Sequence, residues 1–170
     1  ILEGGRLLQV GTPSDLYNHP ESPFVAGFLG AVNRLSGVIE KQNGNQTVIA
    51  LKGGIKINCE PQSNFAAGQE VSCFIRPEKM FFHAEEKSGT SLNRVNTLIV
   101  DKTFLGNQTQ YQVKLENGQT CTVPVSHGSG EENNNVLHSG DRVEILFSAR
   151  DVMQFENSIT PERTSDDSSD

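Results

Sequence analysis

Residues 68–82 read GQEVSCFIRPEKMFF, and residues 140–154 repeat the pattern as GDRVEILFSARDVMQ. Apolar side chains alternate with other residues in the first half of both stretches, which predicts β-strands with one buried face. The matched apolar positions are Val71/Val143, Cys73/Ile145 and Ile75/Phe147. The repeat therefore predicts two related β lobes. A chance match between two alternating strands is the alternative explanation.

The likeness between the lobes extends upstream. Residues 34–41 (RLSGVIEK) are similar to residues 94–102 (RVNTLIVDK), and each stretch leads to a Gly-Asn-Gln-Thr tetrapeptide, at Gly44 and at Gly106. From Asn33 onward, glycine and asparagine turns recur roughly every eight to twelve residues, which is typical of a small barrel or sandwich. We therefore expect a mainly β chain.

Turn residues predict the register of two hairpins. In the first lobe we place two-residue turns at Asn43–Gly44 and Gly53–Gly54, because they give one apolar face across three strands. The predicted pairs are Ile39–Val48, Val48–Cys59 and Ala50–Ile57. In the second lobe only a three-residue loop, 116–118, keeps the apolar faces together, with its glycine in the left-handed conformation. The predicted pairs there are Tyr111–Val123 and Val113–Cys121.

The first thirty residues follow another pattern. Residues 4–11 (GGRLLQVG) predict a short strand bounded by glycines. Thr12–Pro13 and Ser22–Pro23 are each a capping residue followed by a proline suited to a first helical position. They predict two short helices, the first reaching about Asn18 and the second stopping at Gly30.

Composition and motifs give little indication of a catalytic or ligand-binding site. The chain of 170 residues carries a formal net charge of −7 without a basic stripe, which argues against a nucleic-acid partner. The sequence has no Gly-rich loop ending in Lys-Ser or Lys-Thr for nucleotide phosphates, and its four histidines lack metal-ligand spacing. Its three cysteines form no Cys-x-x-Cys pair and lie in alternating apolar patterns, so we expect reduced core thiols. We predict no catalytic, cofactor-binding or metal residues.

The most suggestive local feature is residues 75–79, Ile-Arg-Pro-Glu-Lys. A proline interrupts two apolar strands, and Arg76 and Glu78 flank it on the same side. A charged bend of this kind can dock a partner. The alternative is a turn at a sheet edge with solvated charges.

A family resemblance adds to these observations. Residues 4–37, GGRLLQVGTPSDLYNHPESPFVAGFLGAVNRLSG, resemble the junction at which the nucleotide-binding domain of an ABC importer ATP-binding subunit passes into its C-terminal extension. FIRPEKM (residues 74–80) and FLGNQTQYQVKLENGQ (residues 104–119) resemble two signatures of the TOBE-type regulatory domain. Within this family, the sequence most resembles the spermidine/putrescine and ferric-iron importers. The family's catalytic motifs would lie upstream, so we expect a piece of a longer protein.

The resemblance implies an OB-like or TOBE β-barrel with two related lobes, preceded by a short strand and two short helices. The implied segments are 1–30, the end of the nucleotide-binding domain, and the two β lobes, 31–86 and 94–157. Polar composition, and not the resemblance, predicts a linker at 87–93 and a disordered acidic tail at 158–170. Polar residues 126–140 are expected to form a long surface loop. The candidate regulatory or interface residues are Arg76, Glu78, Phe104 and Gly106.

The function implied is that of a regulatory and dimerisation domain in a bacterial polyamine importer. The chain itself would be no enzyme and hold no cofactor, whereas ATP and Mg²⁺ would bind the parent protein. Its partners would be a second copy, the upstream ATPase domain and, through the parent, membrane permease subunits at the inner face of the cell membrane. Two alternatives are a stand-alone module that binds a small ligand or oxyanion, related to molybdate-binding domains, and a nucleic-acid-binding barrel.

Overall fold

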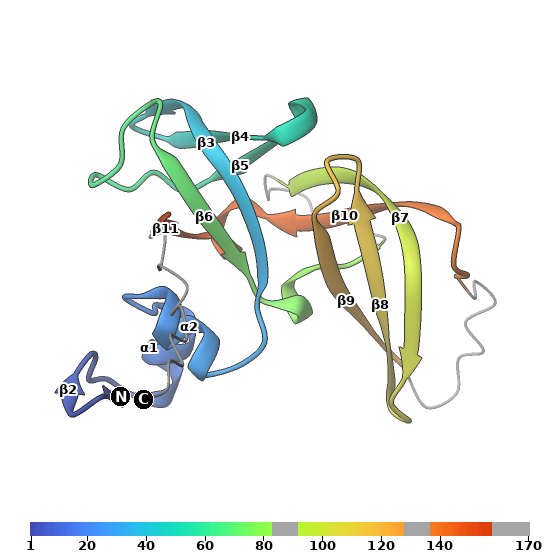
Figure 1. Ribbon diagram of the computed structural model, residues 1–170, viewed down its shortest axis with the longest axis horizontal. Helices are drawn as coiled ribbons and strands as arrows, with labels where there is room; N and C mark the ends of the chain where they lie inside the picture. Colours follow the sequence, from blue (N-terminus) through green and yellow to red (C-terminus); the bar gives the residue numbers. More distant parts are fainter. Residues whose placement is uncertain (83–91, 128–136, 158–170) are drawn as a thin grey trace, which may run out of the picture.

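The computed structural model describes residues 1–82, 92–127 and 137–157. In chain order its elements are β1 (Leu2–Glu3), β2 (Arg6–Leu7), α1 (Pro13–Asn18), α2 (Pro23–Phe28), β3 (Asn33–Asn43), β4 (Gln46–Leu51), η1 (Lys52–Gly54), β5 (Lys56–Cys59), β6 (Glu70–Ile75), η2 (Pro77–Lys79), β7 (Leu92–Phe104), β8 (Gln108–Leu115), β9 (Thr120–Ser126), β10 (Arg142–Ser148), η3 (Ala149–Asp151) and β11 (Met153–Glu156). Two antiparallel sheets dominate, with strand orders β11-β6-β3-β4-β5 and β10-β7-β8-β9 (Figure 1). The predicted mainly β fold is confirmed.

The two lobes repeat one another in detail. β3 to β6 correspond to β7 to β10, and the first strand of each set carries a bulge just after an isoleucine. The amide of Gly68 donates to the carbonyl of Ile39 at 2.7 Å, and the amide of Gly140 donates to that of Ile99 at 2.8 Å. The sequence repeat therefore reflects a structural repeat, and each residue of one lobe can be compared with its counterpart in the other.

The last strand of the chain crosses from the second lobe to the sheet of the first. β11 follows β10 along the chain but pairs with β6 in the other sheet, with Met153 opposite Phe74. In return Phe81, which follows β6, bridges Leu146 on β10. Residues 94–157 therefore contribute to both sheets, because β7 to β10 form one sheet and β11 joins the other.

Two asparagines tie the lobes together. The side chain of Asn33, on β3, accepts from the amide of Thr122 at 2.7 Å and donates to its carbonyl at 2.8 Å. Asn93, the counterpart on β7, makes the same pair of bonds to Asn58 on β5 at 2.6 and 2.9 Å. Each side-chain amide thus takes the place of a neighbouring strand for one residue of the opposite lobe. A single main cluster of buried apolar side chains, drawn from both sheets, lies between them.

The predicted register of the first hairpin is wrong by one residue. Ile39 pairs with Ile49, and Ile49 with Ile57, so Val48 and Ala50 face away from the core. The side chain of Asn43 accepts from the amides of the second and third residues after it, which moves the turn to residues 44–45. The new turn alone would place Ile39 opposite Ala50, and the bulge after Ile39 takes back one residue, so Ile39 lies opposite Ile49.

The second hairpin follows the prediction. Tyr111 pairs with Val123 and Val113 with Cys121, and Gly118 has a φ of 87°. One boundary differs nearby, because β7 begins at Leu92, inside the predicted linker 87–93. Most of that linker, most of the predicted loop 126–140 and the predicted acidic tail lie outside the described residues.

The N-terminal segment contains the two predicted helices. Thr12 and Ser22 cap α1 and α2 through their side-chain oxygens, and a proline opens each helix. The predicted single strand is instead the small β1–β2 hairpin, in which Gly4 and Gly5 form the turn with φ of 54° and 79°. We call residues 1–31 the N-terminal unit and the two sheets together the β domain.

All three cysteines are free and buried, as predicted. Burial raises the pKa of the Cys59 and Cys121 thiols to about 12, and it also raises that of Cys73. Because the thiolate is the reactive form, we expect the native thiols to react with an aromatic disulfide reagent at pH 8 about a hundredfold more slowly than the unfolded chain. The coloured aromatic thiol released from the reagent measures both rates. Fast reaction of one cysteine per native chain would contradict the expectation.

Candidate functional site: the Arg76 junction

Arg76 joins the β domain to the N-terminal unit. It follows the last residue of β6 and is 3% exposed. Its Nη1 donates to the carbonyls of Ala26, Gly30 and Ala31 at 2.8, 3.1 and 3.3 Å. Its Nη2 donates to the carbonyl of Tyr17 at 3.2 Å. One side chain therefore holds the C-terminal regions of both α1 and α2.

The charge of Arg76 is buried without an opposite charge. Among the described residues no ion pair includes its guanidinium, and its Nε has no hydrogen-bond partner. The Cζ lies 4.0 Å from the centroid of the Tyr17 ring, a cation–π geometry. Carbonyls near the ends of helices carry partial negative charge, which favours a cation there. Four carbonyls and an aromatic face replace the water that this cation loses on burial.

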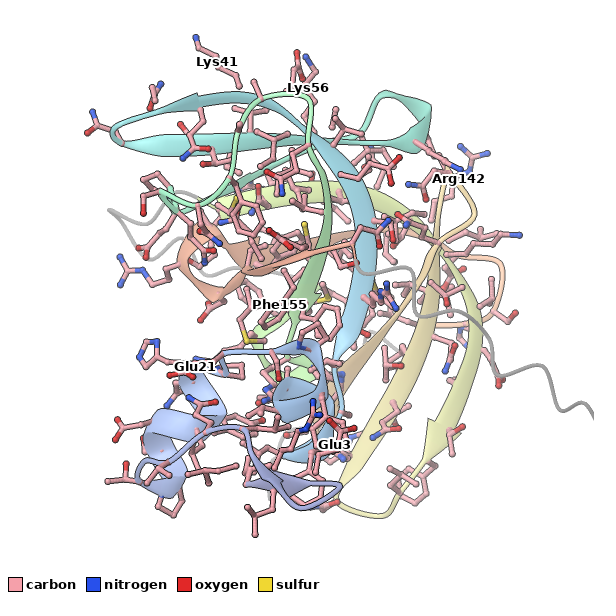
Figure 2. All side chains as sticks on the ribbon, turned by 60° about the vertical axis from the view of Figure 1, so that its left-hand side comes forward. Glu3, Glu21, Lys41, Lys56, Arg142 and Phe155 are labelled. Carbon is pink, nitrogen blue, oxygen red and sulfur yellow. The ribbon has the colours of Figure 1, made fainter. Side chains whose placement is uncertain are left out.

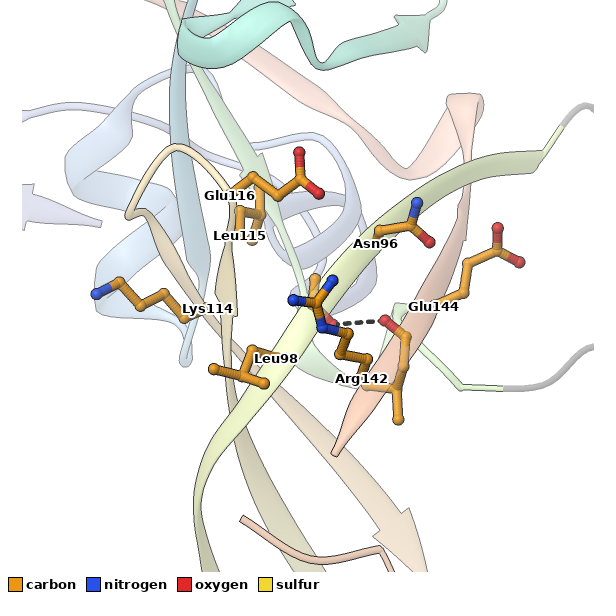
Figure 3. Close-up of a pocket in the computed structure, with 9 residues that line it drawn as sticks. Asn96, Leu98, Lys114, Leu115, Glu116, Arg142 and Glu144 are labelled. Carbon is orange, nitrogen blue, oxygen red and sulfur yellow. Dashed lines mark hydrogen bonds between the residues drawn. The ribbon is translucent and has the colours of Figure 1, made fainter. Parts of the chain in front are cut away.

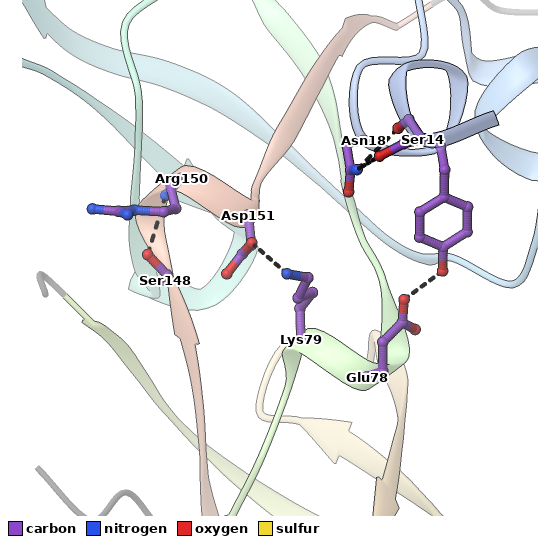
Figure 4. Close-up of polar contacts among 8 residues, drawn as sticks. Ser14, Asn18, Glu78, Lys79, Ser148, Arg150 and Asp151 are labelled. Carbon is purple, nitrogen blue, oxygen red and sulfur yellow. Dashed lines mark hydrogen bonds and ion pairs between the residues drawn. The ribbon is translucent and has the colours of Figure 1, made fainter. Parts of the chain in front are cut away.

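Glu78 reaches the same unit from the turn that follows. Its carboxylate accepts a hydrogen bond from the hydroxyl of Tyr17 on α1 (Figure 4). Burial, and then this bond and the charge of Glu78, raise the pKa of Tyr17, while the charge of Arg76 opposes the change. The next residue, Lys79, points the other way and pairs with Asp151 at 3.4 Å. The turn thus contacts both the N-terminal unit and the end of the second lobe.

A small apolar contact completes the junction. Ala26 of α2 is fully buried against Phe74 and Phe155, and the two rings meet edge to face with centroids 5.1 Å apart. Figure 2 shows Phe155, on strand β11, next to α2. This cluster is separate from the main core between the sheets.

Phe104 and Gly106 lie elsewhere, at the turn between β7 and β8. Phe104 is 70% exposed, with its ring 5.6 Å from that of His127, and Gly106 has a φ of 83°. In Figure 1 this turn is at the lower end of the sheet of β7 to β10, to the right of and apart from the N-terminal unit. The structure therefore brings Arg76 and Glu78 together and leaves Phe104 and Gly106 as a separate pair.

A shallow cup of about 590 Å³ opens on strands β7, β8 and β10 (Figure 3). Its lining combines apolar Leu98 with cations such as Arg142 and anions such as Glu116. In Figure 3 the head groups of Lys114 and Arg142 do not converge on one point. The cup therefore favours no one class of charged ligand.

The N-terminal unit also exposes apolar side chains that the sequence did not single out. They are Leu2, Leu7, Val10, Phe24 and Phe28, between 38% and 77% exposed. Leu2 and Leu7 are cross-strand partners, and the rings of Phe24 and Phe28 stack with centroids 6.0 Å apart. An exposed apolar set of this kind commonly marks a surface that another protein element covers.

The described residues contain no group of three or more His, Cys, Asp or Glu side chains placed to hold a metal ion. None of the helices in the described part of the chain has the length and apolar character needed to cross a membrane.

A known domain family matches the part of the β domain from β6 onward. Residues 73–155, from β6 to β11, match the TOBE domain. The chain carries a TOBE domain. The TOBE match begins inside the first lobe and runs through the second, so it includes Arg76 and Glu78 and strand β11.

Sequence relatives extend the match to the N-terminal unit. The chain is 30% identical over 152 residues to the Spermidine/putrescine import ATP-binding protein PotA of Rubrobacter xylanophilus, covering 88% of the chain and 38% of the relative. It is 31% identical over 153 residues to the protein of the same name from Mesorhizobium japonicum, covering 86% and 38%. The TOBE-containing chain is thus distantly homologous to the C-terminal part of these proteins and spans well under half of their length.

A solved structure shows the same fold. The cytoplasmic molybdate-binding protein ModG, with molybdate bound, superposes with a TM-score of 0.61 at 17% identity, covering 73% of this chain and 95% of ModG. At that identity the similarity concerns the fold alone.

Proposed function

We propose that this chain is the regulatory and pairing part of the ATP-binding subunit of a bacterial importer, and that polyamines such as spermidine and putrescine are its solutes. The homology to the C-terminal part of PotA proteins carries the proposal, because it runs through both the N-terminal unit and the TOBE domain. The parent protein would bind ATP and Mg²⁺ and would work at the inner face of the cell membrane with permease subunits.

The exposed apolar side chains of the N-terminal unit support an upstream partner domain. Five large apolar residues lie within the first 28 positions, on a unit that Arg76 fastens to the β domain. The proposed occupant of this surface is the ATPase domain that precedes the matching region in the relatives. A second copy of the β domain would pair with the first and bias the opening and closing of the two ATPase domains, a coupling of about 1–3 kcal/mol in typical allosteric proteins.

The test is uptake in the cell of origin. We expect deletion of the coding region for residues 33–157 from the chromosome to change the rate or control of labelled spermidine and putrescine uptake, while uptake of an unrelated amino acid stays the same. Ferric iron uptake is measured in the same strain. Unchanged polyamine uptake with altered iron uptake would overturn the choice of solute, and no change in either would overturn the proposal.

Oxyanion binding can be tested separately. The similarity to ModG extends to the fold alone, and fold does not fix function. Calorimetric titration of the chain with molybdate, sulfate and spermidine distinguishes the two functions, because a regulatory domain without a ligand gives no binding heat with any of them. Saturable heat with molybdate would favour the oxyanion-binding module.

A further inference from the structure

We propose that Arg76 is a positioning residue that fixes the orientation of the N-terminal unit on the β domain, so that the two move as one body. The consequence for an importer rests on the proposed function: a displacement of the ATPase domain would reach the TOBE domain through this side chain. The fixed orientation is a property of the chain itself and can be measured without knowing the solute.

The internal repeat shows that the β fold does not require an arginine at this place. Ile75 pairs with Asn33 as Phe147 pairs with Asn93, so Ser148 is the counterpart of Arg76. Both positions are buried, at 8% and 3% exposure, and both precede a one-turn 3₁₀ helix. Among the described residues, the hydroxyl of Ser148 bonds only the amide of Arg150, in its own turn. The same strand end is thus built with a small hydroxyl in one lobe and with a guanidinium in the other.

The N-terminal unit contacts the position of Arg76 and accounts for the difference from Ser148. All four acceptors of the Arg76 guanidinium belong to residues 17–31, and so does the ring against which it stacks. In the described part of the chain, no hydrogen bond of the Arg76 side chain goes to the β domain. A guanidinium is planar and its donors point in fixed directions, so carbonyls from both helices are held in one relative position. The Arg76 side chain therefore contacts the N-terminal unit, whereas the residues of β6 before it pair within the sheet.

The other contacts across the junction restrict the orientation of the N-terminal unit less strongly. The packing of Ala26 on Phe74 and Phe155 is apolar and non-directional. The bond between Tyr17 and Glu78 lies at the exposed side. Loss of Arg76 should leave the unit attached through these contacts, with more than one orientation available.

A pair of spin labels tests this. Ser14→Cys on α1 and Thr120→Cys on β9 place labels on the two bodies, and the buried native thiols stay unlabelled in the native chain. Pulsed electron resonance then gives the distance distribution. We expect one narrow population in the parent pair and a second, separate population when Arg76→Met is added, while the thermal unfolding of the β domain stays cooperative. Arg76→Lys should give an intermediate width, since a lysine keeps the charge without the planar array of donors.

Arg34→Met is the matched control. Arg34 also lies near an aromatic ring, with Cζ 5.8 Å from the Phe74 centroid, and it bonds Ser72 within the sheet. It donates to no residue of the N-terminal unit, so we expect its loss to leave the distribution narrow. If Arg76→Met does not fold, Tyr17→Leu removes the stacking ring from the other side and should give the second population. An unchanged narrow distribution in the folded Arg76 or Tyr17 variant, or equal broadening by Arg34→Met, would overturn the proposal. If deletion of residues 33–157 left polyamine uptake unchanged, that result would count only against the proposed function.

Discussion

Replacement of Asn33 by alanine is expected to lower the free energy of unfolding by about 2–4 kcal/mol. Asn33 is 5% exposed, and its side-chain amide satisfies both the N–H and the C=O of Thr122 in the opposite lobe. Alanine leaves these two backbone groups without that partner at a place largely closed to water. A buried polar group without a partner costs far more than a hydrogen bond contributes on average. Urea unfolding followed by far-ultraviolet circular dichroism measures the change.

The repeat supplies both a replicate and a control for this experiment. Asn93→Ala removes the same two bonds in the other direction, to Asn58, and should cost a similar amount. Asn96→Ala, on the solvent side of β7, should change the free energy by less than about 0.5 kcal/mol, as is usual for surface positions. If Asn33→Ala and Asn96→Ala were equally mild, the side-chain bridges between the lobes would contribute nothing to stability.

The parts of the fold predicted correctly depend on local chemistry. Thr12 and Ser22 cap helices because their oxygens reach amides three residues on, and this can be recognised in a short stretch. The loop at Gly118 was predictable because only one loop length keeps the apolar faces together. In the first hairpin, the side chain of Asn43 moved the turn by one residue and a bulge moved the register again. Neither shift disturbs the alternation of apolar residues, so the pattern alone could not reveal them.

Of the four candidate residues, Arg76 and Glu78 lie at the junction with the N-terminal unit, and the regulatory role assigned to all four stays a prediction. Arg76 and Glu78 stood out as charges beside a proline, and both do contact another part of the chain. The partners of Arg76 are backbone carbonyls, which every residue carries, so no sequence pattern marks them. The pairing of β11 with β6 was equally hidden, because the alternating sequence of β11 fits the edge of either sheet. A position-by-position comparison of the repeats would have flagged Arg76 against Ser148 and is the signal that sequence reasoning could have used.

Removal of β11 is expected to have the largest effect of all. A chain that ends at Val152 loses Phe155, which is 8% exposed, and uncovers the edge of β6 from Val71 to Phe74. Loss of a buried phenylalanine side chain alone costs about 3–5 kcal/mol. The missing strand pairing adds to this, and a domain of this size is stable by only about 5–15 kcal/mol. We expect this chain to lack a cooperative thermal transition and to bind a hydrophobic dye at 25 °C, whereas a chain ending at Asn157, which keeps β11, should unfold in one transition.

The same experiment decides whether the lobes fold separately. If each lobe were an independent unit, loss of β11 would weaken only the five-stranded sheet, and the sheet of β10, β7, β8 and β9 would still melt at the temperature of the longer chain. The reciprocal bridge of Phe81 to Leu146 and the bonds of Asn33 and Asn93 argue against this, because each sheet takes part of its edge from the other lobe. Hydrogen exchange resolved by residue distinguishes the outcomes. Retained protection at Val113 and Val123 in the shortened chain would show that the second lobe stands alone, and its loss there would show that the pairing of β11 with β6 makes both lobes one cooperative unit.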